Sequence, residues 1–84
     1  TKVITVSIKV PSVKRITDTP PSLEEAQGMV GGLVEIVYVG DDQLLCHEEA
    51  LFKDPAVQNP EASQLAGIPI FGEAVLLSGD ALWD

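Results

Sequence analysis

A chain of 84 residues has room for one domain built around a small hydrophobic core. Its 45% apolar and 21% charged side chains exclude a disordered chain, and its uncharged apolar runs are too short to span a membrane. The formal net charge of −8 argues against binding to nucleic acid or to an anionic membrane, and it favours a partner with a basic surface.

This charge is distributed unevenly along the chain. Four of the five basic residues lie within residues 1–20, whereas 12 of the 13 acidic residues follow within residues 21–84. A solvated acidic surface that keeps the protein soluble explains the same composition without any partner.

The first expected element is a strand over residues 3–10, where β-branched residues alternate with polar ones. Residues 11–21 contain three prolines and are therefore predicted to form a loop. Lys14 and Arg15 lie in this predicted loop as the one positive cluster of the sequence, and we regard them as a candidate anion-binding pair.

A short helix is predicted next. Ser22 and Glu25 have the spacing of a capping box, in which each side chain accepts a hydrogen bond from the backbone N–H of the other residue. Gly31 and Gly32 then end the helix after about two turns, because glycine readily adopts the left-handed conformation of a C-cap.

Two strands joined by a turn are predicted in the middle of the chain. Residues 33–39 are almost all apolar, with Glu35 as the exception, and this composition predicts a central strand. A turn at residues 40–42 leads to a second strand over residues 43–47, and the pair is predicted to be a hairpin.

The remaining elements are a second helix and a last strand. Asn59 is a good N-cap, Pro60 suits the first helical position, and Gly67 ends this short helix. A strand over residues 73–77 follows, and Trp83 is expected to dock on the body of the domain.

The resulting order, β-α-β-β-α-β, predicts one α+β domain over residues 1–84 with a small, mainly antiparallel sheet and two short helices. A ferredoxin-like fold has the same order, with both helices on one face of an antiparallel sheet.

Several runs of residues also resemble a small family whose members have no assigned activity. The runs are S-L-E-E-A-Q at 22–27, V-G-G-L-V-E at 30–35, H-E-E at 47–49, N-P-E-A at 59–62 and I-F-G-E at 70–73. Residues 20–78 are in this way similar to a domain of unknown function common in bacteriophages, plasmids and their bacterial hosts. His47 stands where that family usually has Asn. The resemblance implies a mobile-element accessory protein and supplies no catalytic residue.

Cys46 and His47 are the obvious candidates for nucleophilic catalysis. Adjacent residues on a strand point to opposite faces, so they are not expected to form a thiolate–imidazolium pair. We expect a buried Cys46, a surface His47 and no enzymatic activity. An enzyme would need a site assembled across subunits from His47, Glu48 and Glu49.

No metal or cofactor is expected. Asp41 and Asp42 together with residues 47–49 could surround a cation, but they lack the alternating oxygen ligands and turn glycine of a calcium loop. Zinc requires more cysteine or histidine ligands than this chain has. The glycines at 28, 31 and 32 end a helix, whereas a phosphate loop places its glycines before one.

The acidic residues that we assign to a protein-binding surface are Glu35, Asp41, Asp42, Glu48, Glu49 and Asp54. We expect a small acidic accessory protein that binds and modulates a host protein in the host cytoplasm, as an inhibitor of transcription or of a defence enzyme, with DNA mimicry as one mode. The absence of a visible signal peptide and the single cysteine favour the cytoplasm. The alternative is a homo-oligomer that binds a small molecule or nucleotide, with Lys14 and Arg15 as its anion-binding element.

Overall fold

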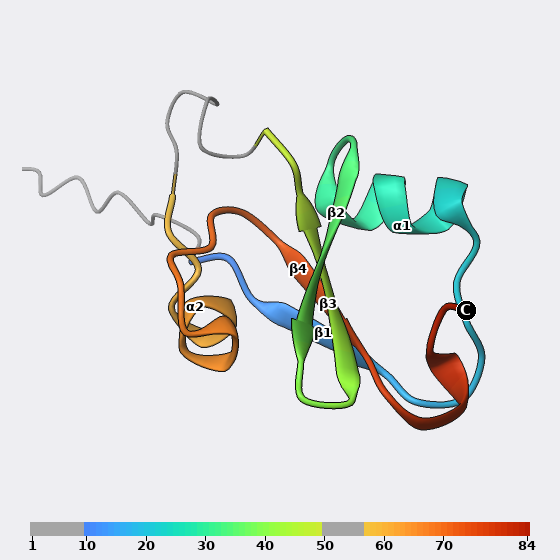
Figure 1. Cartoon of the computed structure of the whole chain (residues 1–84). Helices are drawn as coiled ribbons and strands as arrows, with labels where there is room; N and C mark the ends of the chain where they lie inside the picture. Colours follow the sequence, from blue (N-terminus) through green and yellow to red (C-terminus); the bar gives the residue numbers. More distant parts are fainter. Residues whose placement is uncertain (1–9, 50–56) are drawn as a thin grey trace, which may run out of the picture.

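The computed structural model of the chain describes residues 10–49 and 57–84 (Figure 1). The strand predicted over residues 3–10 lies outside the described residues except for Val10, which is exposed and belongs to no strand. The described elements are β1 (Val13–Ile16), α1 (Leu23–Val30), β2 (Val34–Val39), β3 (Asp42–His47), α2 (Pro60–Ala66), β4 (Ala74–Leu77) and the 3-10 turn η2 (Gly79–Ala81).

The four strands form one mixed sheet in the order β1-β4-β3-β2. β1 pairs with β4 in parallel, whereas β4 with β3 and β3 with β2 pair antiparallel. The predicted α+β class and the element order β-α-β-β-α-β are confirmed.

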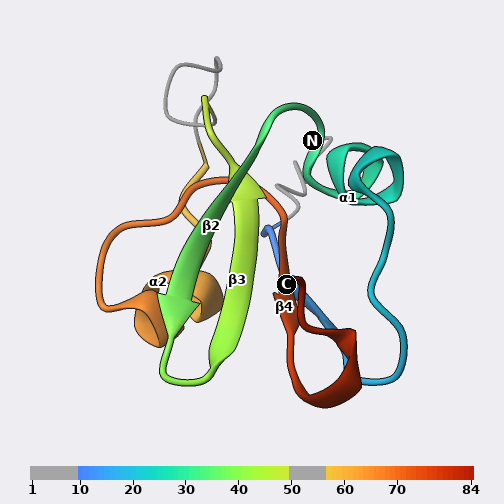
Figure 2. The ribbon, with the colours of Figure 1, turned by 45° about the vertical axis from the view of Figure 1, so that its right-hand side comes forward.

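The two helices cover opposite faces of this sheet (Figure 2). On one face Leu45 and Leu77 pack with Ala26 and Val30 of α1. The other face is formed by the alternate residues of the same two strands, which pack against α2 and the segment after it. The strand residues are Leu44, Cys46, Ala74 and Leu76, and they pack with Ala62 of α2 and with Ile70. We call these the α1 face and the α2 face.

Burial on both faces explains the composition of the two inner strands. Residues 43–46 of β3 and all four residues of β4 are buried. Residues 44–46 and 74–77 are therefore continuous apolar runs instead of alternating patterns. The ferredoxin-like arrangement is not confirmed, because β1 and β4 are parallel and the helices do not share a face.

Both predicted helix starts are confirmed. The backbone N–H of Glu25 donates to Oγ of Ser22, and the N–H of Ser22 donates to Oε1 of Glu25, each at 3.1 Å. Oδ1 of Asn59 accepts from the N–H of Ala62 at 3.0 Å and caps α2. The helices end where predicted, because Gly31 and Gly67 adopt φ values of 89° and 72°.

The side chain of Asn59 also joins three segments of the chain. Its Nδ2 donates to the carbonyl oxygens of Ser12 and Gly72 at 3.0 and 2.9 Å. Asn59 is completely buried, so these bonds satisfy a polar group that would otherwise destabilise the core. The start of α2 is thereby tied to the segments that precede β1 and β4.

The predicted docking of Trp83 is confirmed. Its backbone N–H donates to Oε1 of Gln43 at 2.7 Å, and Nε2 of Gln43 donates back to the Trp83 carbonyl at 2.7 Å. The indole Nε1 donates to the carbonyl of Pro21 at 2.9 Å. The chain end is therefore held against β3 and the segment before α1.

Two predictions about strands are wrong. Lys14 and Arg15 lie on β1 and not in a loop. This segment forms a strand because it pairs with β4 along its whole length, from Val13–Ala74 to Ile16–Leu77. The prolines on which the loop prediction rested lie outside the strand. β2 is an edge strand and not a central one. It is apolar because residues of both faces, such as Ile36 and Val37, pack against the two core clusters.

Candidate functional site

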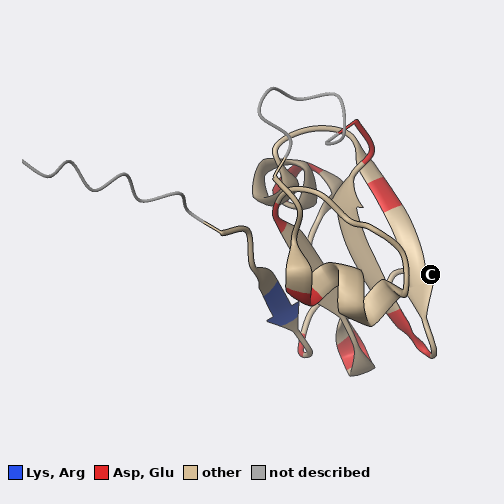
Figure 3. Ribbon diagram, turned by 90° about the vertical axis from the view of Figure 1, so that its left-hand side faces the viewer, with Lys and Arg blue, Asp and Glu red and all other residues tan. Residues whose placement is uncertain are grey.

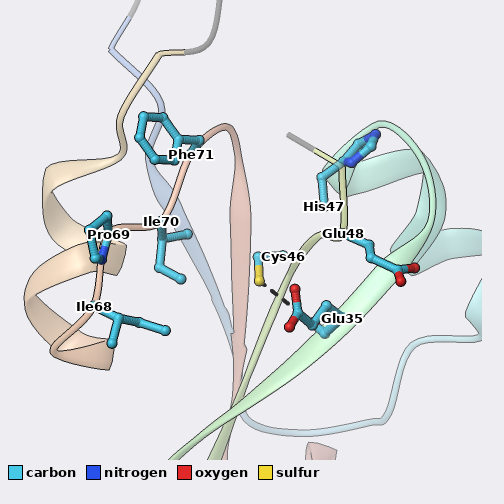
Figure 4. Close-up of a pocket in the computed structure, with 8 residues that line it drawn as sticks. All are labelled: Glu35, Cys46, His47, Glu48, Ile68, Pro69, Ile70 and Phe71. Carbon is cyan, nitrogen blue, oxygen red and sulfur yellow. Dashed lines mark hydrogen bonds between the residues drawn. The ribbon is translucent and has the colours of Figure 1, made fainter. Parts of the chain in front are cut away.

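A cavity of about 390 Å³ lies on the α2 face, between the end of the β2–β3 hairpin and the segment that joins α2 to β4 (Figure 4). The hairpin contributes Glu35, Cys46, His47 and Glu48, and the connecting segment contributes the run Ile68, Pro69, Ile70 and Phe71. The volume falls within the range of natural ligand pockets and also suits one or two protein side chains.

Glu35 and Cys46 are directly opposite each other on β2 and β3. The Cys46 Sγ donates to the Glu35 carbonyl at 3.6 Å, the dashed contact in Figure 4. Burial and, to a smaller extent, the negative charge of Glu35 raise the pKa of Cys46 from 9.0 to about 11. The thiol is therefore protonated at neutral pH and is a poor nucleophile.

His47 contributes to the cavity without directing its ring into it. In Figure 4 the imidazole points away from the wall formed by residues 68–71. The ring lies against Gly32, and its Nδ1 accepts a hydrogen bond from the N–H of Glu49 at 2.9 Å. His47 is partly exposed. Cys46 and His47 point to opposite sides of the strand, as predicted, so they do not form a thiolate–imidazolium pair.

The opposite wall of the cavity is held by hydrogen bonds around Ile70. Oγ of Ser63 accepts from the Ile70 N–H at 2.8 Å and donates to the Ile70 carbonyl at 3.2 Å. The N–H of Asn59 donates to the same carbonyl at 2.7 Å, and Gln58 forms an isolated β-bridge with Phe71. These contacts fix an apolar wall opposite the Glu35 carboxylate.

The structure separates the predicted acidic residues into two groups. Glu35, Glu48 and Glu49 lie at or next to the cavity. Asp41 and Asp42 lie at the hairpin turn, roughly 20 Å away by the rise of an extended strand. The sixth predicted residue, Asp54, lies outside the described residues.

The two predicted anion-binding residues do not converge. Adjacent residues on β1 point to opposite faces, so the side chains of Lys14 and Arg15 diverge. Nη2 of Arg15 donates to Oε2 of Glu61 at 2.9 Å, and both side chains are about half exposed. Among the described residues, Figure 3 shows basic residues on β1 alone, whereas acidic residues occur on many elements.

Residues 10–49 and 57–84 were compared with the requirements of a metal site and of a membrane-spanning helix. No group of three or more His, Cys, Asp or Glu side chains in these ranges is placed to hold a metal ion. No helix there has both the length and the apolar character that crossing a bilayer requires.

Comparison with known proteins places the chain in a family. The model of a family described as "Domain of unknown function (DUF3846)" matches residues 1–82. The chain belongs to the DUF3846 family. The resemblance to a family without an assigned activity is thereby confirmed. No curated protein and no solved structure matches the chain.

The V-G-G sequence of this DUF3846 domain has a structural role at each position. Val30 is buried in the core of the α1 face, and Gly31 provides the left-handed C-cap with a φ of 89°. Gly32 leaves room for the imidazole of His47, and the need for this second glycine could not be read from the sequence.

The apolar wall of the cavity was also missed as part of a site. The run I-P-I-F at 68–71 lies between the predicted second helix and the predicted last strand, and no binding role was predicted for it. Its proline and its position directly after a helix C-cap were the available signals that these apolar side chains do not belong to a regular element.

Proposed function

We propose that this DUF3846 domain is a protein-binding accessory module that captures a basic segment of a partner at the cavity beside Glu35. The observation that supports this proposal best is the composition of the cavity, whose lining combines the acidic residues Glu35 and Glu48 with the apolar wall of residues 68–71. A lysine or arginine side chain has the complementary composition, with an apolar stem and a charged head.

The charge of the described surface supports the same class of partner. Of the described residues 12 are acidic, whereas only Lys14 and Arg15 are basic, and Arg15 is paired with Glu61. A field of this sign accelerates association with a basic surface and weakens as salt is added.

In the setting implied by a mobile-element protein, the partner would be a host protein in the host cytoplasm, and binding would inhibit transcription or a defence enzyme. Acidic groups at the two ends of one hairpin, at Asp41 and Asp42 and at Glu35 and Glu48, suit a basic groove that otherwise holds DNA. DNA should then compete with the domain for its partner.

The proposal is tested by capturing partners from a native lysate with the immobilised domain and two charge-matched variants. The double variant Glu35→Gln/Glu48→Gln removes both carboxylates of the cavity, whereas the control Glu24→Gln/Asp84→Asn removes the same charge from residues that do not line it. We expect the partner to be retained by the control and lost from the cavity variant. Equal retention by both variants, or no enriched partner, would contradict the proposal.

The cavity volume also favours a second candidate function, the binding of a small molecule by an oligomer. The charged side chains of the cavity are carboxylates, so such a ligand would be cationic and not a nucleotide. A monomeric mass by light scattering would remove the oligomer from consideration.

A further inference from the structure

In the part of the chain that the structure describes, the outer edge of β2 has no neighbouring strand. β2 is the last strand in the order β1-β4-β3-β2. The N–H of Glu48 donates to the carbonyl of Leu33 at 2.8 Å, one residue beyond the pair Val34–His47. Because hydrogen-bonded and non-hydrogen-bonded pairs alternate in an antiparallel ladder, Glu35, Val37 and Val39 direct their backbone groups toward β3. The N–H and C=O groups of Val34, Ile36 and Tyr38 therefore point outward.

This edge has few of the features that usually prevent strand addition. β2 contains neither proline nor glycine, its only charged residue is Glu35, and four of its six residues are β-branched. Tyr38, near its end, is 71% exposed. Within the described chain no segment pairs with the outer side of this strand.

We propose that the edge of β2 binds an extended basic segment of a partner protein as a fifth strand of the sheet. This inference rests on the proposed function and adds the binding mode to it. A strand beside β2 would place every second side chain on the α2 face, next to Glu35 and the cavity. A lysine or arginine at that position would meet the Glu35 carboxylate while its stem covers the apolar wall.

The charges near β2 favour a basic partner over a second copy of the domain at this edge. Antiparallel pairing of two β2 edges would bring the acidic turn of each copy, Asp41 and Asp42, toward the start of β2 in the other copy, near Glu48 and Glu49. Like charges would then face each other at both ends of the new pair. A basic segment would be attracted at the same two places.

Tyr38 provides a test that leaves the contacts between β2 and β3 in place. Its N–H points outward, so Tyr38→Pro removes a donor only from the open edge and inserts a ring where the added strand would lie. Tyr38→Thr also removes the aromatic ring but keeps the N–H. The near-ultraviolet circular dichroism of Trp83 shows whether each variant is folded. Val34→Pro, at the first residue of β2, is the second blocking variant if Tyr38→Pro does not fold.

The probe is a capped peptide of about eight residues, a typical strand length, that alternates lysine with valine, compared with one that alternates glutamate with valine. We expect the lysine peptide to bind wild type and Tyr38→Thr alike, and Tyr38→Pro at least about tenfold more weakly. The glutamate peptide should bind none of them.

Three other results would contradict the inference. If Tyr38→Pro leaves binding of the lysine peptide unchanged and Glu35→Gln weakens it, strand addition is overturned while the proposed function stands. No binding of the lysine peptide at low salt would overturn both. A wild-type dimer that Tyr38→Pro dissociates would assign the edge to a second copy and overturn the basic partner.

Discussion

The imidazole ring of His47 occupies the space that a Cβ atom on Gly32 would need. An ideal Cβ there would overlap Nε2 of the ring and lie 2.9 Å from its Cδ2 atom. The same ring accepts a hydrogen bond from the N–H of Glu49 through Nδ1. The contact thus joins the segment after α1 to the end of β3, whose residues line the cavity.

Gly32→Ala should therefore destabilise the domain by about 1–2 kcal/mol, because the added methyl group forces the His47 ring out of its place and costs the bond to Glu49. In the background of His47→Ala the same substitution should be neutral or slightly stabilising. Urea unfolding of the four proteins in this double-mutant cycle measures the coupling. Equal effects of Gly32→Ala in both backgrounds would show that the ring does not restrict position 32.

Gly28 is the matched control for Gly32. It lies in the middle of α1, it is exposed, and nothing lies within 4 Å of a Cβ atom built on it. Gly28→Ala should stabilise the domain by about 0.5–1 kcal/mol, because alanine favours a helix more than glycine does. Destabilisation in the same urea experiment would mean that α1 differs from the described helix.

Asn59→Asp separates the cap of α2 from the other bonds of this side chain. Aspartate keeps an acceptor for the N–H of Ala62, but it presents an oxygen to the carbonyl oxygens of Ser12 and Gly72. We expect a loss of about 3 kcal/mol or more, at least as large as for Asn59→Ala, because the buried carbonyls lose their donor and a charge is added. Thermal unfolding of both variants checks this order. A milder effect of aspartate than of alanine would show that the cap matters more than the two donated bonds.

Cys46 should make the stability of the domain depend on pH above the usual pKa of a thiol. Because the pKa of the folded state, about 11, lies above 9.0, the unfolded chain loses its proton first as the pH rises. The free energy of unfolding should fall between about pH 9 and pH 11, by up to about 3 kcal/mol from this group. Denaturation at several pH values, compared with Cys46→Ala, measures the contribution. Parallel pH profiles of the two proteins would contradict it.

The ion pair between Arg15 and Glu61 should contribute little to stability. Both side chains are about half exposed, so water and salt screen the attraction. Arg15→Gln should change the free energy of unfolding by less than about 0.5 kcal/mol. A loss above about 1 kcal/mol in urea unfolding would show that the pair is more strongly coupled to the fold than its exposure indicates.

Local chemistry was enough to predict much of this fold. Ser22 with Glu25, and Asn59 with Pro60, set the starts of both helices at the correct residues because capping depends only on neighbours in sequence. The hairpin turn was predicted on the same basis. Gly40 takes a φ of 59° at the first position of a two-residue turn, which a type II′ turn requires.

What the sequence could not supply was the arrangement of elements distant along the chain. β1 forms because it pairs with β4, some 60 residues later, and its own four residues include Lys14 and Arg15. Of the cavity, Glu35 and Glu48 were predicted as binding residues, but the apolar wall opposite them was not. Only the folded chain brings the segment after α2 to the end of the hairpin.

The measurement that most directly tests the binding of a basic segment at β2, beside the Glu35 cavity, is residue-resolved amide hydrogen exchange of the domain with and without the lysine–valine peptide. In the free domain the amides of Val34, Ile36 and Tyr38 should exchange rapidly, because they point outward, while Val37 exchanges slowly. Saturation with the peptide should slow the three outward amides by at least about tenfold. If these three amides remain unprotected in the saturated complex, the peptide does not bind as a strand at the edge of β2.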